Sequence, residues 1–144
     1  YHGPGQIVAY PILDLNRLNL GLHEYMRLLE QAVIDTCAAF GIRGERDPKA
    51  TGVWVDGAKI AAFGVRVRKW ISMHGLALNV TTDLSHFGLI VPCGLHGRPV
   101  TSMNTLLGAT CPSVDEVRGS LRGHLTRLII GAWETACVKR SGVV

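Results

Sequence analysis

Apolar side chains recur with a helical period in two parts of the chain. Over residues 22–40 they return every three or four positions, and Gly41 follows where a helix C-terminal cap belongs. A second regularly spaced apolar face begins at residue 114, directly after Ser113, and Glu116 completes the sequence pattern of a capping box. The spacing therefore predicts two long helices, one in the first third of the chain and one at its end.

Strand patterns occupy the start and the middle of the chain. Residues 7–13 form a short apolar run after a Gly/Pro turn. Asp56 and Gly57 provide the positive φ angles of a tight hairpin turn, and the second arm of that hairpin runs over residues 60–67. A further strand is predicted over residues 70–80, with a break at His74-Gly75.

The segments between these elements predict loops and one short helix. Residues 44–51 are charged and rich in turn formers, which is typical of a loop. Asp83 precedes a short apolar stretch over residues 84–89 and is placed to cap a helix there. Residues 90–102 pass from an apolar run into a loop. The order of elements predicts one α/β (α+β) domain over residues 1–144, with helices packed on a central mixed sheet.

Composition excludes several classes of protein. Of the 144 residues, 47% are hydrophobic and 18% are charged, which excludes a disordered chain. The formal charge is +4, and the basic cluster of Arg66, Arg68 and Lys69 is interpreted as a solvated strand face rather than a nucleic-acid patch. The same cluster is a candidate docking surface for an acidic protein. No apolar run approaches the ~18 residues of a membrane span, so no membrane association is expected.

The cysteines and histidines do not show a metal-site spacing. Cys37, Cys93, Cys111 and Cys137 fit no Cys-x-x-Cys pattern, and a chain of this length has no need of cross-links, so reduced thiols in an intracellular compartment are expected. His74 lacks a second ligand at short spacing, and no glycine-rich phosphate loop is present. The sequence thus predicts neither a metal nor a bound cofactor.

Two residues are candidates for chemistry. Cys93 lies between Pro92 and Gly94, where an apolar strand gives way to a loop, and a thiol there becomes a nucleophile if a positive charge is nearby. Lys59 leads into an otherwise apolar strand, where a partly buried ammonium could lower the pKa of a thiol and move protons. The structural alternatives are a buried loop cysteine and a solvated lysine at a strand start.

Several short motifs follow one another in the order known for one enzyme family. They are Tyr1-His2-Gly3-Pro4-Gly5-Gln6, Thr51-Gly52-Val53-Trp54-Val55, Lys59-Ile60-Ala61-Ala62-Phe63-Gly64-Val65-Arg66, His74-Gly75-Leu76-Ala77-Leu78-Asn79-Val80, Asp83-Leu84, Ile90-Val91-Pro92-Cys93-Gly94 and Val100-Thr101-Ser102. In these motifs the chain resembles the lipoyl(octanoyl) transferases, the protein N-octanoyltransferases of lipoate synthesis. The resemblance covers residues 1 to about 102.

The resemblance implies a reaction and assigns roles to residues. Cys93 would take an octanoyl group from octanoyl-acyl carrier protein as a thioester and pass it to a lysine of a lipoyl domain, while Lys59 would lower the thiol pKa and handle protons. The acceptors would be the lipoyl domains of 2-oxoacid dehydrogenases and the glycine cleavage H protein. The implied acyl pocket comprises Tyr1, His2, Ala62, Phe63, Gly64, His74, Gly75, Leu76 and Ala77. The implied fold is that of biotin protein ligases and lipoate ligases.

The resemblance also bears on completeness, activity class and compartment. Family members carry an N-terminal portion ending in Arg-Gly-Gly-x-x-Thr before the Tyr-His-Gly-Pro-Gly motif, so this chain is expected to be N-terminally incomplete. An ATP-dependent lipoate-protein ligase of the same fold and a non-catalytic module that binds lipoyl domains are the alternative functions. A mitochondrial location is favoured over a cytoplasmic one.

Overall fold

A five-stranded antiparallel sheet forms the centre of the computed structural model, which describes residues 1–89 and 98–142. The strand order is β1-β5-β4-β3-β2, and each neighbouring pair is antiparallel. The strands are β1 (Gln6–Ala9), β2 (Glu45–Asp47), β3 (Ala50–Val55), β4 (Ala58–Arg68) and β5 (Ile71–Asn79). Among the described residues the parallel part of the expected mixed sheet is a single bridge between Lys59 and Val100.

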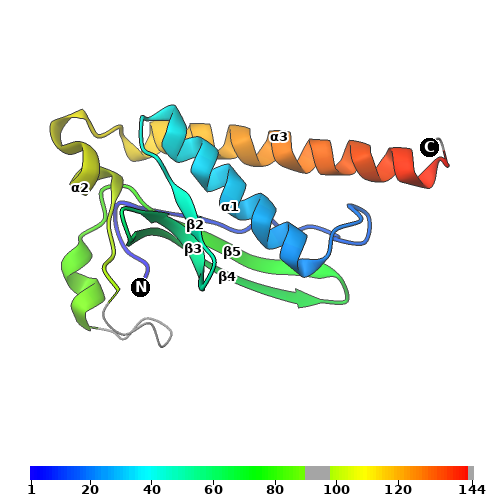
Figure 1. The fold of residues 1–144 in the computed structure, drawn as a ribbon, viewed down its shortest axis with the longest axis horizontal. Coiled ribbons are helices and arrows are strands. Elements are labelled where there is room, and N and C mark those ends of the chain that lie inside the picture. Colours follow the sequence, from blue (N-terminus) through cyan, green and yellow to red (C-terminus); the bar gives the residue numbers. More distant parts are fainter. Residues whose placement is uncertain (90–97, 143–144) are drawn as a thin grey trace.

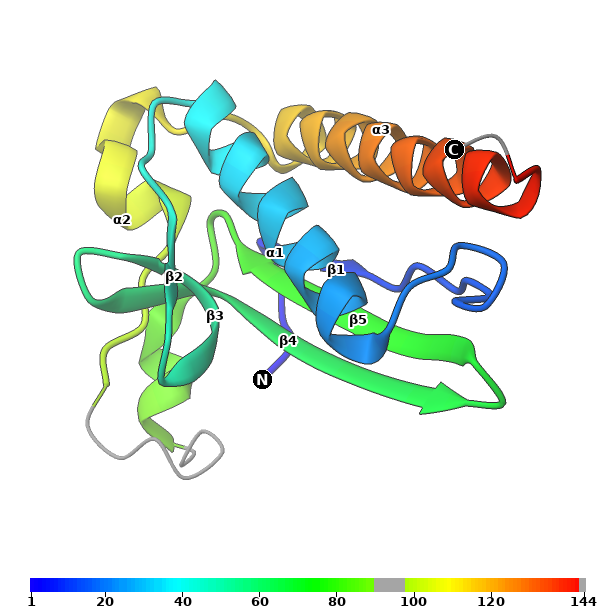
Figure 2. The ribbon, with the colours of Figure 1, turned by 45° about the vertical axis from the view of Figure 1, so that its right-hand side comes forward.

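Two long helices cover one face of the sheet. They are α1 (Leu22–Ala39) and α3 (Val114–Arg140), and Figures 1 and 2 show α1 lying across the sheet beside α3. Tyr25 and Leu29 of α1 and Leu121 of α3 share one buried cluster with Leu76 and Leu78 of β5. Burial of this shared apolar face, rather than helix propensity alone, holds the two layers together.

Three short elements lie at the β3–β4 hairpin end of the sheet. The 3-10 helices η1 (Leu84–Leu89) and η2 (Gly108–Thr110) and the helix α2 (Met103–Leu107) follow β5 in the chain (Figure 2). The main-chain N–H of Ser85 donates to Asp83 Oδ1, which confirms the predicted cap of η1. The main-chain N–H of Asn104 donates to the Val80 carbonyl and fixes α2 to the end of β5.

The local signals for helix ends and for the hairpin are confirmed. Ser113 Oγ accepts the Glu116 main-chain N–H, and the Glu116 carboxylate accepts the Ser113 main-chain N–H, so the capping box is formed. At the hairpin, Asp56 and Gly57 have φ angles of 48° and 78°, the left-handed pair that matches the twist of the flanking strands. Gly41, with a φ of 77°, follows the end of α1 as predicted.

Two local predictions are wrong. Part of the predicted loop over residues 44–51 is strand β2, because Arg46 reaches back to Glu30 and Gln31 of α1 and holds this charged segment at the sheet edge. The predicted break in the third strand is absent, since β5 pairs with β4 without a register shift through His74, although His74 itself has a φ of 61°.

Candidate functional site

Lys59 is held at the start of β4 by the segment that follows residues 90–97. Its main-chain N–H donates to the Pro99 carbonyl over 2.9 Å, and its carbonyl accepts the Thr101 N–H over 2.9 Å. These two bonds form the parallel bridge between Lys59 and Val100. Cys93, the other predicted catalytic residue, lies outside the described residues. In the sequence Cys93 precedes Pro99 by six positions.

The side chain of Lys59 lies over a buried aromatic ring. Lys59 Nζ is 4.7 Å from the centroid of the Trp54 ring, and the guanidinium carbon of Arg98 is 3.8 Å from it. The faces of aromatic rings attract cations, and more so where water is excluded. Gly52 leaves room for this arrangement, since a Cβ there would lie 3.1 Å from Lys59 Cε.

Arg98 is fixed by an ion pair on its outer side. Arg98 Nη2 lies 2.5 Å from Asp47 Oδ2, and the Asp47 carboxylate also accepts the main-chain N–H of Lys49. The Lys49 N–H and then the Arg98 guanidinium hold the pKa of Asp47 below its ordinary value. The strand β2 thus supplies the anion that holds Arg98 beside the Trp54–Lys59 pair.

Four of the predicted acyl-pocket residues lie together on the face of the sheet away from α1 and α3. They form a small-residue area that consists of Ala62, Gly64, Gly75 and Ala77. Ala62 pairs with Ala77 and Gly64 pairs with Gly75 across β4 and β5, and directly opposite residues share a face. A Cβ at Gly64 would meet no atom within 4 Å, so the space above it is open. Ala62 and Gly64 are exposed, whereas Gly75 and Ala77 are buried, and the Ala9 carbonyl oxygen fills the space in which a Cβ of Gly75 would lie.

Two other predicted pocket residues lie on the opposite face. Leu76 is 2% exposed and belongs to the buried core, and Phe63 packs against the same core. Successive side chains of a strand point to opposite faces, and Phe63 and Leu76 are each next in sequence to residues of the small-residue area. The structure therefore separates Phe63 and Leu76 from Ala62, Gly64, Gly75 and Ala77.

The remaining predicted pocket residues make contacts near β1. The Tyr1 ring packs edge-on against Phe87, with centroids 5.2 Å apart, and the His74 ring packs edge-on against Tyr10 at 5.7 Å. His2 Nδ1 lies 2.8 Å from Gln6 Oε1. Tyr1 and His2 therefore adjoin the start of β1, whereas His74 lies toward the β4–β5 turn.

Comparison with known proteins decides the family. Residues 1–126 match the family described as the lipoyl protein ligase A/B catalytic domain. The chain belongs to this family.

Curated relatives agree with the family. The chain is 50% identical over 133 residues to the octanoyltransferase of Christiangramia forsetii, covering 89% of this chain and 57% of the relative. It is 46% identical over 129 residues to the octanoyltransferase of Geobacter metallireducens, covering 90% of this chain and 60% of the relative. The chain thus spans less than two thirds of the length of these relatives.

Solved structures of biotin and lipoate protein ligases share the fold of this chain. The biotin protein ligase of Aquifex aeolicus superposes with a TM-score of 0.70 at 14% identity, over 90% of this chain and 55% of that one. A bi-partite lipoate protein ligase from Thermoplasma acidophilum superposes with a TM-score of 0.68 at 19% identity, over 90% of this chain and 53% of that one. The expected biotin/lipoate ligase-like fold is confirmed.

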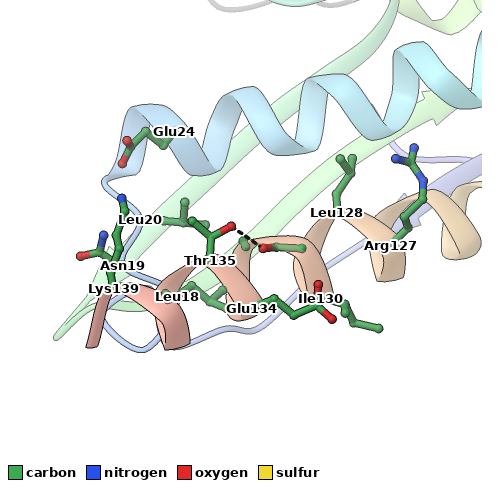
Figure 3. Close-up of a pocket in the computed structure, with 13 residues that line it drawn as sticks. Leu18, Asn19, Leu20, Glu24, Arg127, Leu128, Ile130, Glu134, Thr135 and Lys139 are labelled. Atoms are coloured by element: carbon green, nitrogen blue, oxygen red, sulfur yellow. Dashed lines mark hydrogen bonds between the residues drawn. The ribbon is translucent and has the colours of Figure 1, made fainter. Parts of the chain in front are cut away.

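A large surface groove lies away from the candidate site. It has a volume of about 870 Å³ and is formed by Leu18, Leu20 and the second half of α3, including Leu128 and Thr135 (Figure 3). Leu15 hydrogen-bonds to Trp70 beside the β4–β5 turn, which places the groove at that end of the sheet. Lys59 is the second residue of β4, and the nine residues from it to Arg68 span roughly 30 Å at the usual rise per residue. We therefore assign this groove no part in the site.

Two of the three cysteines in the described part of the chain, Cys37 and Cys111, are unlike a reactive thiol. Burial raises the pKa of Cys37 to about 12, and burial also raises the pKa of Cys111. Cys137 lies on α3 with its Sγ 3.5 Å from Arg140 Nη2.

No group of three metal-ligating side chains occurs within residues 1–89 and 98–142, and no helix in that part has both the length and the apolar character to cross a bilayer.

Sequence reasoning missed four residues, two at the Lys59 side chain and two that are linked by hydrogen bonds to the Thr101 carbonyl. Trp54 and Arg98 stack together, and Gln6 and Asn79 hydrogen-bond across β1 and β5. Trp54, Gln6 and Asn79 lie within the motifs that carry the resemblance, which is the only signal that could have indicated them. Arg98 has no local signal, because its partners Asp47 and Trp54 are distant in the chain.

Proposed function

We propose that the protein containing this chain transfers an octanoyl group from octanoyl-acyl carrier protein to a lysine of lipoyl domains. The observation that carries the proposal is the match at 46–50% identity to curated octanoyltransferases over about nine tenths of this chain. The placement of Lys59 beside a buried ring and next to the segment after Cys93 supports it.

In the proposed first half-reaction, the thiolate of Cys93 attacks the thioester carbonyl of the donor. A new S–C bond forms, the bond to the carrier thiol breaks, and the carrier leaves as a thiol after taking a proton from Lys59. A thioester donor is already activated, so this half-reaction requires neither ATP nor a cofactor. The partly buried position of Lys59 suits this role, because the Trp54 ring restricts the positions open to its amine.

In the second half-reaction, the amine of the acceptor lysine attacks the octanoyl-Cys93 thioester. An amide bond forms and Cys93 leaves as a thiolate. The proton lost by the amine passes to Lys59, which restores the starting state. A single nucleophile that serves two carriers in turn implies ping-pong kinetics.

The small-residue area of Ala62, Gly64, Gly75 and Ala77 is the proposed site of the octanoyl chain. Small side chains leave an eight-carbon chain in contact with the sheet, and burial contributes about 0.8 kcal/mol per CH₂. Tyr1 and His2 would border this area from the side of β1. His74, Phe63 and Leu76, also predicted for the pocket, would shape it indirectly through their packing.

The donor and the acceptor would dock on the basic surface formed by Arg66, Arg68 and Lys69. Arg66 and Arg68 are exposed and lie on the same face of β4 as the small-residue area, at the end of the strand next to the β4–β5 turn. A positive surface at this end of the face speeds the association of acidic partners. The specific acceptors, the lipoyl domains of 2-oxoacid dehydrogenases and the glycine cleavage H protein, and the mitochondrial location stay predictions.

The proposal is tested by mass spectrometry after incubation of the purified protein with octanoyl-acyl carrier protein. We expect a mass increase of one octanoyl group on the peptide containing Cys93, followed by its loss when a lipoyl domain is added. The Cys93→Ser variant should show neither step. If Cys93 stays unmodified, or if Cys93→Ser retains activity with ATP and free lipoate, the proposed function is wrong and a ligase is favoured.

A further inference from the structure

A series of hydrogen-bonded polar side chains crosses the end of the sheet next to Lys59. Gln6 and Asn79 are directly opposite residues of β1 and β5, and Gln6 Nε2 donates to Asn79 Oδ1 over 2.9 Å. Asn79 Nδ2 in turn donates to the Thr101 carbonyl over 3.1 Å. At the outer end His2 Nδ1 meets Gln6 Oε1 at 2.8 Å.

The donors in this series all point toward Thr101. The Thr101 carbonyl can only accept, so Asn79 uses its amide N–H₂ there and its amide oxygen toward Gln6. Gln6 then has its amide oxygen left for His2, so that His2 Nδ1 is the donor. Asn79 needs both a donor and an acceptor, and an aspartate of the same shape would place an oxygen against the Thr101 carbonyl.

Asn79 holds the same short segment that holds Lys59. Thr101 donates its main-chain N–H to the Lys59 carbonyl, and Pro99 accepts the Lys59 N–H. The segment 99–101 is therefore fixed by the main chain of Lys59 and by the side chain of Asn79. Asn79 is 4% exposed and Thr101 is 5% exposed, so water does not replace these bonds readily.

We propose that Asn79, oriented by Gln6, is a positioning residue for Lys59. It fixes segment 99–101, and this segment fixes the main chain from which the Lys59 side chain reaches over Trp54. The inference about position rests only on these contacts, whereas its consequence for turnover rests on the proposed function. A shift of Lys59 by about 1 Å would be enough to slow a proton transfer strongly.

The direct test is the environment of the Lys59 side chain. Reductive ¹³C-methylation labels the N-terminal amine and, within this chain, Lys49, Lys59, Lys69 and Lys139, and loss of one signal in Lys59→Met assigns the Lys59 signal. The methyl signal of Lys59 should be moved upfield by the Trp54 ring. In Asn79→Asp and Asn79→Leu we expect it to move toward the signals of the other lysines, and Gln6→Leu should move it in the same direction by less.

Ser72→Ala is the matched control. Ser72 lies in the same strand as Asn79, is fully buried and also bridges to other segments, with its Oγ bonded to the Pro11 carbonyl and the Leu13 N–H. It lies roughly 23 Å along the strand from Asn79 at the usual rise per residue. Its loss should lower stability without moving the Lys59 signal, so the comparison separates positioning from general destabilisation.

Kinetics provide the second measurement. Asn79→Asp should lower kcat by about 10- to 100-fold and change KM for the carriers by less than about twofold, and Gln6→Leu/Asn79→Leu should be no worse than Asn79→Leu. If the Lys59 signal in Asn79→Asp and Gln6→Leu matches the wild type or Ser72→Ala, the inference is wrong. If Asn79 variants do not fold, the part-buried Gln6→Leu decides. Absence of octanoyl transfer in the wild type would overturn the proposed function and leave the NMR test of positioning valid.

Discussion

The ammonium of Lys59 lies over the ring of Trp54, with Nζ 4.7 Å from the ring centroid. Trp54 is 2% exposed and donates its indole N–H to the Ala50 carbonyl, so the ring is fixed within the sheet. A fixed ring restricts the positions open to a long, flexible side chain. This pair therefore gives Lys59 a defined place next to the segment that follows Cys93.

The first prediction concerns the effect of Lys59 on Cys93. A nearby ammonium stabilises the thiolate, so the pKa of Cys93 should lie below the free value of about 8.5. In Lys59→Met the pH midpoint of Cys93 alkylation by iodoacetamide should rise, as measured by peptide mass spectrometry. Lys69→Met, which removes an exposed lysine from the β4–β5 turn, is the control and should leave the midpoint unchanged. An unaltered midpoint in Lys59→Met would remove Lys59 from the mechanism.

The second prediction concerns the unreactive thiol of Cys37. Burial raises its pKa to about 12, so only on the order of one molecule in ten thousand carries the thiolate at pH 8. In the native protein Cys37 should stay unmodified by iodoacetamide at pH 8 while Cys93 is labelled within minutes. In concentrated urea, where the protein is unfolded and burial is lost, all cysteines should react alike. Labelling of native Cys37 at the rate of Cys93 would contradict the structure.

The third prediction compares two glycines that pair across β4 and β5. A Cβ at Gly75 would collide with the Ala9 carbonyl oxygen of β1, whereas a Cβ at Gly64 enters open space. Gly75→Ala should lower the free energy of unfolding by about 1–3 kcal/mol, because the β1–β5 pairing must shift. Gly64→Ala should change it by less than about 0.5 kcal/mol. Urea unfolding monitored by tryptophan fluorescence measures both, and equal effects would contradict the register.

The fourth prediction concerns the docking surface of Arg66, Arg68 and Lys69. Reversing all three to glutamate should raise KM about tenfold at low salt for both octanoyl-acyl carrier protein and the lipoyl domain. Acylation of Cys93 by a small octanoyl thioester should stay within about twofold of the wild-type rate, because this donor needs no docking. Arg122→Glu, an exposed charge reversal on α3, is the control. If reactivity toward the small thioester also falls, these residues shape the pocket and the docking proposal is wrong.

The fifth prediction concerns acid stability. The hydroxyl and the main-chain N–H of Ser113 hold the pKa of Glu116 below its ordinary value in the folded chain. A depressed folded-state pKa contributes stability that is present above the unfolded value and is lost as the pH falls through the folded value. Glu116→Gln should therefore lower the urea midpoint at pH 7 and have little effect at pH 2. An equal loss at both pH values would assign the effect to the hydrogen bonds alone.

Local features of the chain followed from the sequence alone. The helices α1 and α3, the capping box at Ser113 and the Asp56-Gly57 turn each depend on residues within a few positions of one another. Their periodicity and turn chemistry are properties of the local backbone, so no knowledge of distant partners was needed. The ordered motifs indicated the family for the same reason, since each is a short run of neighbouring residues.

The tertiary structure decided which distant residues meet. Strand β2 exists because Arg46 reaches Glu30, and Arg98 lies beside Lys59 because Asp47 and Trp54 hold it there. The register of β4 against β5 decided that Gly64 and Gly75 face one way while Phe63 and Leu76 face the core. A shift of one residue would exchange these faces without altering the sequence pattern of either strand. Composition and spacing could propose Lys59, but only the folded sheet places Asn79, Thr101 and Trp54 around it.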